Sequence, residues 1–233
     1  MKKAFTMAEV LVTIGIIGVV AAMTIPSLIN RYRTFVLMQQ FRKAYAAISV
    51  AAEKVQFDMG ENVKCNYGAG GSWIDCRLFY RELFKQMNVI KSCKGYALRK
   101  GCLPTEFYKA TEDDYAEGYP NLDPDTVKEQ FKSSCTGFST QVIEKVSHVY
   151  VLQGGFHVIL YYTGTAPLFW VDINGKKRPN KWGHDLFAFE FRKDKITNSY
   201  NKLVPSTGCR LKEKDGYTSQ EFFNLINRGT ANF

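Results

Sequence analysis

The sequence lacks the short motifs that mark common catalytic and nucleotide-binding sites. No GxSxG, HExxH, GxGxxG or P-loop pattern occurs in its 233 residues, although each such pattern places a nucleophile, a metal or a phosphate in a defined geometry. Histidine is scarce, with three residues, and two of these, His148 and His157, fall in β-rich runs where structural histidines are common. We therefore expect no enzymatic activity and no obligatory cofactor.

The sequence also lacks a CxxC pattern, and its histidines are scattered, so the cysteines do not have the spacing of a zinc site. The six cysteines are Cys65, Cys76, Cys93, Cys102, Cys135 and Cys209. An even number of cysteines favours disulfides in an oxidising compartment. Six cysteines allow fifteen pairings. Short loops favour Cys65–Cys76 and Cys93–Cys102, which leaves Cys135–Cys209, and zinc ligation stays an alternative.

No charged residue occurs from Val10 to Ile29. Twenty apolar residues in a helix span about 30 Å, the thickness of the hydrocarbon core of a bilayer. A cleaved secretory signal would have a shorter apolar run, while a signal anchor would fit its length and the preceding Lys2 and Lys3. This segment is therefore predicted to be a membrane helix.

No block of five or six like charges accompanies the formal net charge of +9. Such a surplus favours anionic partners, which include lipid headgroups, acidic glycans and nucleic acid. Because the cations are spread over the chain, solvated surfaces are the preferred interpretation.

A single carboxylate, Glu9, stands at the head of the apolar segment. At the centre of a membrane a charge costs about 2.5–3.5 kcal/mol on insertion scales, and less near the interface, so such residues usually have a partner. A free α-amino group on a neighbouring subunit could be that partner if the chain were cut a few residues upstream.

The stretch from Lys2 to Val12, KKAFTMAEVLV, resembles the cleavage signal of type IV prepilins and type II secretion pseudopilins. In that family a prepilin peptidase cuts before a Phe and methylates the new amine, an invariant Glu follows, and a proline bends the helix further on. The resemblance implies cleavage after Ala4, where the family usually has Gly, and methylation of Phe5. It also implies that Phe5, Glu9 and Pro26 act in assembly.

The resemblance further implies partners and a location. The partners would be homologous pilin or pseudopilin subunits, the peptidase and the cytoplasmic membrane. The chain would cross that membrane once with its head outside, and then enter a cell-surface or periplasmic filament. A type II secretion pseudopilus would act on secreted protein cargo, and a competence pilus would take up DNA. The rival hypothesis is a secreted or signal-anchored extracytoplasmic binding protein.

Periodicity predicts an α+β fold. A helical stripe of apolar residues follows the membrane segment (Phe35, Met38, Phe41, Tyr45, Ile48, Ala52 and Val55). Four β-rich runs occur near the C-terminus (146–152, 156–162, 168–173 and 186–192). We expect a leader (1–4), a membrane helix (5–29), its amphipathic continuation (30–57) and a disulfide-bearing head (58–233). The helix would pack on an antiparallel sheet of about four strands, as in pilins.

One polar segment of the head, from Val171 to Asp185, resembles a loop of pseudopilin-like heads. Asp172, Asn174 and Asp185 offer the oxygen donors that Ca²⁺ prefers. Their spacing is not that of an EF-hand, and four nearby cations oppose a metal, namely Lys176, Lys177, Arg178 and Lys181. An Asx-type turn that holds a hairpin is therefore favoured over calcium.

Overall fold

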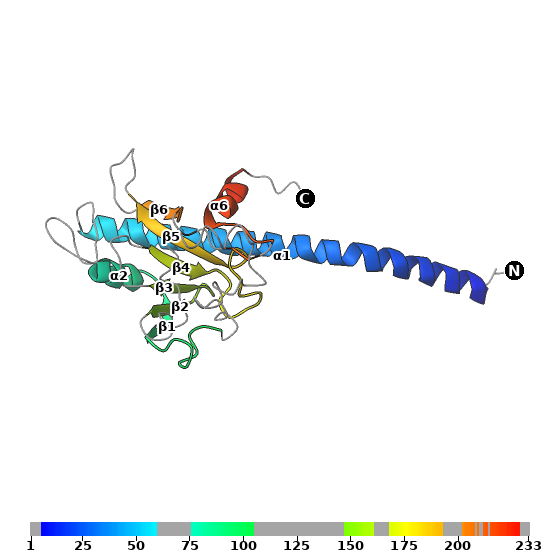
Figure 1. Ribbon diagram of the computed structural model, residues 1–233, viewed down its shortest axis with the longest axis horizontal. Coiled ribbons are helices and arrows are strands. Elements are labelled where there is room, and N and C mark those ends of the chain that lie inside the picture. Colours follow the sequence, from blue (N-terminus) through cyan, green and yellow to red (C-terminus); the bar gives the residue numbers. More distant parts are fainter. Residues whose placement is uncertain are drawn as a thin grey trace, which may run out of the picture.

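The computed structural model describes residues 6–59, 76–104, 147–160, 168–192, 202–207, 209, 212–213 and 215–228. Its helices are α1 (Met7–Met59), α2 (Cys76–Lys85) and α6 (Ser219–Asn227). Its strands are β1 (Val89–Lys94), β2 (His148–Leu152), β3 (His157–Leu160), β4 (Leu168–Asp172), β5 (Leu186–Arg192) and β6 (Lys202–Pro205). Figure 1 shows a rod-like α1 whose first half projects away from a head that is built on its second half.

Helix α1 is 53 residues long, which corresponds to about 80 Å at about 1.5 Å per residue. It continues through Pro26 and curves gently (Figure 1), so the sharp bend that was predicted at this proline is not seen. Proline removes one helical hydrogen bond, yet the hydrogen bonds on either side still hold the two segments in line. The apolar segment and the head therefore share one continuous helix.

The second half of α1 buries the predicted apolar stripe. Its buried residues are Met38, Phe41, Ala44, Ile48, Ala51, Ala52 and Val55. Two members of the predicted stripe differ, because Phe35 is exposed and Tyr45 is only half-buried with its hydroxyl donating to the Leu203 carbonyl at 2.8 Å. The stripe therefore starts about one turn later than its periodicity suggests.

The sheet is an antiparallel meander of six strands in the order β1-β2-β3-β4-β5-β6. The four strands predicted from the sequence are confirmed within a few residues, and the bounds of β5 agree fully. The estimate of about four strands was too low, because β1 and β6 were missed. β1 carries two lysines and β6 is four residues long and ends in Pro205, so neither shows the apolar alternation that marks a strand.

Both faces of the sheet are covered. Alternate residues of β5 illustrate this, since Phe187 and Phe189 pack with α1 and α2, while Leu186 and Ala188 belong to a second cluster on the other face. The second cluster also contains Cys93, Ala97, Cys102, Leu103, Val149, Ile159, Trp170, Trp182 and Cys209. Such double burial explains why the strands are nearly continuous apolar runs.

Two short helices complete the described fold. α2 ends at Lys85, after which the chain turns and enters β1 at Val89. α6 was not predicted, although Thr218 and Glu221 form a capping box at its start.

Candidate functional site

The first half of α1 is an apolar surface that no other described element covers. None of the residues from Thr6 to Arg33 is buried, and Leu11 and Leu28 are each more than three-fifths exposed. The segment is long and apolar enough to cross a membrane. Large contiguous apolar surfaces of this kind mark membrane or protein contacts.

Polar side chains within this surface are satisfied by the helix itself. The Thr13 hydroxyl donates to the Glu9 carbonyl at 2.9 Å, and the Thr24 hydroxyl donates to the Val20 carbonyl at 2.9 Å. In hydrocarbon every polar group must find its partner inside the protein. A Cβ atom added at Gly15 or Gly18 would meet nothing within 4 Å, so both glycines leave room for the close approach of another helix.

Glu9 has a local role that the sequence prediction overlooked. Its side chain accepts hydrogen bonds from the Thr6 backbone N–H at 2.8 Å and from the Thr6 hydroxyl at 2.9 Å. The Glu9 N–H donates to Thr6 Oγ1 at 3.3 Å. Thr6 and Glu9 therefore form a capping box at the start of α1, and the T-x-x-E spacing before an apolar run was the signal for it. Ala4 and Phe5 lie outside the described residues.

The structure brings the three predicted calcium ligands together. Asp172 is the last residue of β4, Asn174 lies two residues later, and Asp185 directly precedes β5. Asp172 pairs with Leu186, the first residue of β5. Both aspartates are fully buried, and Asn174 is 7% exposed. We call these three side chains the buried oxygen cluster.

Backbone N–H groups take up part of the cluster. The two carboxylate oxygens of Asp185 accept from Asn180 N–H and Lys181 N–H, each at 2.7 Å. Asp172 Oδ1 accepts from Asn174 N–H at 3.2 Å, which is the predicted Asx-type turn. The cluster thus shapes the loop between β4 and β5.

Two oxygens of the cluster are buried without a hydrogen-bond partner, Asp172 Oδ2 and Asn174 Oδ1. Orphaned buried acceptors of this kind are rare and call for an explanation such as a bound ion. The two oxygens fit a calcium ligand set in chemistry. Among the described residues, however, no three His, Cys, Asp or Glu side chains gather as a metal site, so the amide would have to be the third ligand.

Burial changes the protonation of this region. Burial, with the nearby Asp185 as a smaller cause, holds the pKa of Asp172 well above its usual value. Burial also raises the pKa of Asp185 to about 6, and that of Glu213 to about 7 despite Lys181 Nζ at 3.9 Å. A buried carboxyl group without a counter-charge keeps its proton more tightly. A bound cation would favour the ionised carboxylate instead.

The two histidines of the sheet are partly or largely buried. His148 and His157 lie in β2 and β3, as predicted. Burial, and secondarily Lys176, lower the pKa of His157 to about 4, so this side chain is neutral at physiological pH. Its Nδ1 atom is buried without a partner.

The cysteines are oxidised wherever the structure describes them. Cys93 and Cys102 form the predicted short-loop disulfide, and Cys76 and Cys209 are also disulfide-bonded. The partners predicted for these two, Cys65 and Cys135, lie outside the described residues. Zinc ligation is thereby excluded for the four described cysteines, because a disulfide sulfur is not a thiolate.

Comparison of the chain with protein-family models, with curated proteins and with solved structures finds no match. The functional argument therefore depends on the residues and the geometry given above.

Proposed function

We propose that the chain is a structural subunit of a filament of the type IV pilus or type II secretion pseudopilus kind. The observation that carries this proposal is the division of α1. Its first half is apolar and exposed, whereas its second half lies in the core of the head. An element of this form can rest in a bilayer and can later pack against copies of itself.

The N-terminal residues support the same function. The stretch from Lys2 to Val12 has the order of a prepilin cleavage signal, with Glu9 four residues beyond Phe5. Removal of Met1–Ala4 would create an α-amino group at Phe5. On an incoming subunit this amine could neutralise Glu9 of its neighbour and set the axial register, the best-attested use of buried ion pairs.

In this proposal the chain crosses the cytoplasmic membrane once, with its head outside, and is extracted into the filament after processing. The disulfides suit that location, because such bonds persist in oxidising compartments. The rival is a signal-anchored or secreted binding protein, for which Glu9 would serve only as a helix cap.

The test is the intact mass and N-terminal sequence of the protein from native membranes, with and without reduction. We expect a chain that begins at N-methylated Phe5. A chain that keeps Met1 would favour the plain anchor, and one that begins near Met23 would favour secretion. Either of these results would overturn the filament proposal.

A further inference from the structure

One segment of the head carries several positive charges and no negative charge. Residues 89–104 contain Lys91, Lys94, Arg99 and Lys100 and no acidic residue. All four cations are exposed. We call residues 91–102 the basic loop; it includes the end of β1 and the turn that follows.

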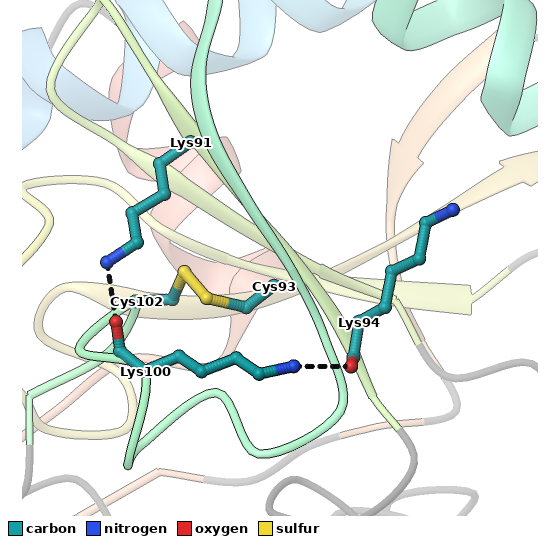
Figure 2. The surroundings of a disulfide bond; sticks show 5 residues. All are labelled: Lys91, Cys93, Lys94, Lys100 and Cys102. Carbon is teal, nitrogen blue, oxygen red and sulfur yellow. Dashed lines mark hydrogen bonds between the residues drawn. A yellow bond between two sulfur atoms is a disulfide. The ribbon is translucent and has the colours of Figure 1, made fainter.

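The basic loop is tightly closed. Figure 2 shows the Cys93–Cys102 disulfide across its base, with Lys91 Nζ donating to the Lys100 carbonyl and Lys100 Nζ donating to the Lys94 carbonyl at 3.0 Å. Both cysteines are buried in the cluster on one face of the sheet. The cations are therefore held on a preformed scaffold, so binding a partner would cost little ordering entropy.

A cation from another part of the chain joins this surface. A Cβ atom at Gly101 would lie 3.8 Å from Lys176 Nζ, which places Lys176, from the loop after β4, beside the basic loop. Neither Lys94 nor Lys176 forms an ion pair with a carboxylate among the described residues. Their charges therefore remain available to an external anion.

An aromatic side chain lies among the cations. Tyr96 is 46% exposed, with Arg99 Cζ at 5.5 Å and Lys100 Nζ at 5.9 Å from its ring centre. Such contacts hold both cations over the ring. A tyrosine hydroxyl can also donate to a phosphate oxygen.

The basic loop and α1 lie on different sides of the sheet. Cys93 and Cys102 pack with Trp170 and Ile159, whereas α1 packs on the opposite face with Phe187 and Phe189. β1 is also at the end of the strand order, and Figure 1 shows it as the strand drawn farthest from α1. The loop would stay accessible while α1 is covered by lipid or by other helices.

We propose that the basic loop, together with Lys176, binds the phosphate backbone of duplex DNA. A duplex carries about one negative charge per 1.7 Å of its axis, so it can engage several clustered cations at once. Anionic lipid is the less suitable partner because the loop is separated by the sheet from the helix that would enter the membrane. The binding is to the backbone and is independent of DNA sequence, since loop lysines reach phosphates rather than base edges.

The test uses the full chain in detergent micelles and a fluorescein-labelled duplex of about 20 base pairs, with anisotropy recorded over a series of NaCl concentrations. The variant Lys94→Gln/Lys176→Gln leaves the disulfide and the hydrogen bonds of the loop in place. We expect its affinity to fall by about tenfold or more, and the slope of log K against log salt to decrease by about 1.8, or about 0.9 for each lost phosphate contact.

The matched control is Lys54→Gln/Lys85→Gln, which removes the same charge from the helices α1 and α2. It should keep the affinity and the slope of the wild type. Equal losses in both double variants would overturn the proposal, because the net charge alone would then explain binding. Binding to vesicles of anionic lipid, but not to DNA, would overturn it too and assign the loop to a membrane surface. Because these experiments need no assembly, they are independent of the filament proposal.

Discussion

Asp172 and Asp185 show how single residues set the chemistry of a loop. Both carboxyl groups are buried, and only Asp185 has both of its oxygens hydrogen-bonded to backbone N–H groups. In the folded chain the pKa of Asp185 is raised to about 6, above the usual aspartate value of about 3.9. The folded state therefore binds this proton more tightly than the unfolded state does.

This linkage predicts a pH dependence of stability. The stability that protonation of Asp185 contributes is fully present below about pH 4 and is lost as the pH rises through about 6. Asp172, whose pKa is raised in the same direction, adds to this loss. Calcium bound at the cluster would offset this loss near pH 7, by about 2.7 kcal/mol at about 100 times its Kd, and would have little effect near pH 4. Thermal unfolding with calcium or with EDTA measures both effects.

The variant Asp172→Asn should remove the part of the pH dependence that Asp172 contributes, and any calcium effect, since it replaces the titrating carboxyl group with a neutral amide. It keeps an oxygen for the Asn174 N–H. Asp215→Asn is the matched control, because Asp215 is exposed and lies outside the cluster, and it should change neither quantity. If calcium leaves the wild-type melting temperature at pH 7 unchanged, the cluster is only a turn.

Glu9 has an observed role as a helix cap and a proposed role in assembly, and substitutions can separate the two. As the N3 residue of the capping box, it can be replaced by Gln without loss of the cap. Gln cannot replace Glu9 as the partner of a neighbouring charged amine, because Gln carries no negative charge. Thr6→Ala removes the cap, at a cost of about 1 kcal/mol, and keeps the carboxylate.

We expect Glu9→Gln to lower the amount of chain in sheared filaments at least tenfold, with membrane insertion and processing unchanged, because the buried amine loses its counter-charge. Thr6→Ala should assemble within about twofold of the wild type. Immunoblots of filament and membrane fractions measure both. Normal assembly of the Glu9→Gln chain would contradict the register role.

At the scale of elements, Phe41 is a buried aromatic residue of α1 that contacts several parts of the head. Phe41 is 1% exposed, and its ring lies 5.0 Å from Phe187, 5.3 Å from Phe189 and 5.2 Å from Phe222 between ring centres. It thus connects α1 to β5 and to α6. Aromatic pairs at such distances stabilise a core beyond their buried area.

Phe41→Ala should therefore lower the free energy of unfolding of the head by about 3–5 kcal/mol, the range for deletion of a buried aromatic side chain. Phe57→Ala is the matched control on the same helix, because Phe57 is 86% exposed and should change stability by about 0.5 kcal/mol or less. Urea unfolding followed by circular dichroism in detergent measures both. Equal effects of the two substitutions would contradict the packing that is described here.

At the scale of the whole molecule, the sheet divides the head into two sides. One face receives α1, which continues into the exposed apolar segment, and the other carries the disulfide-closed basic loop. If the filament proposal holds, this arrangement leaves one side for anchoring and assembly while the other stays open to an external partner. The two proposals therefore concern separate surfaces of the chain.

The sequence by itself determined the elements whose signals are local. A charge-free run with its amphipathic continuation specifies α1, and apolar β-rich runs specify the four middle strands, because residue periodicity reports which side of an element is buried. The Cys93–Cys102 disulfide was also predictable, since it closes a short loop. The capping boxes of α1 and α6 had a local signal too, but it was overlooked.

Only the tertiary structure decided what depends on contacts between distant segments. β1 and β6 become strands because neighbouring strands pair with them, an influence that propensity does not contain. The burial of Asp172 and Asp185, and the approach of Lys176 to Gly101, likewise arise from packing. The surroundings of a charge come from the whole fold, so the sequence could name these residues without showing what faces them.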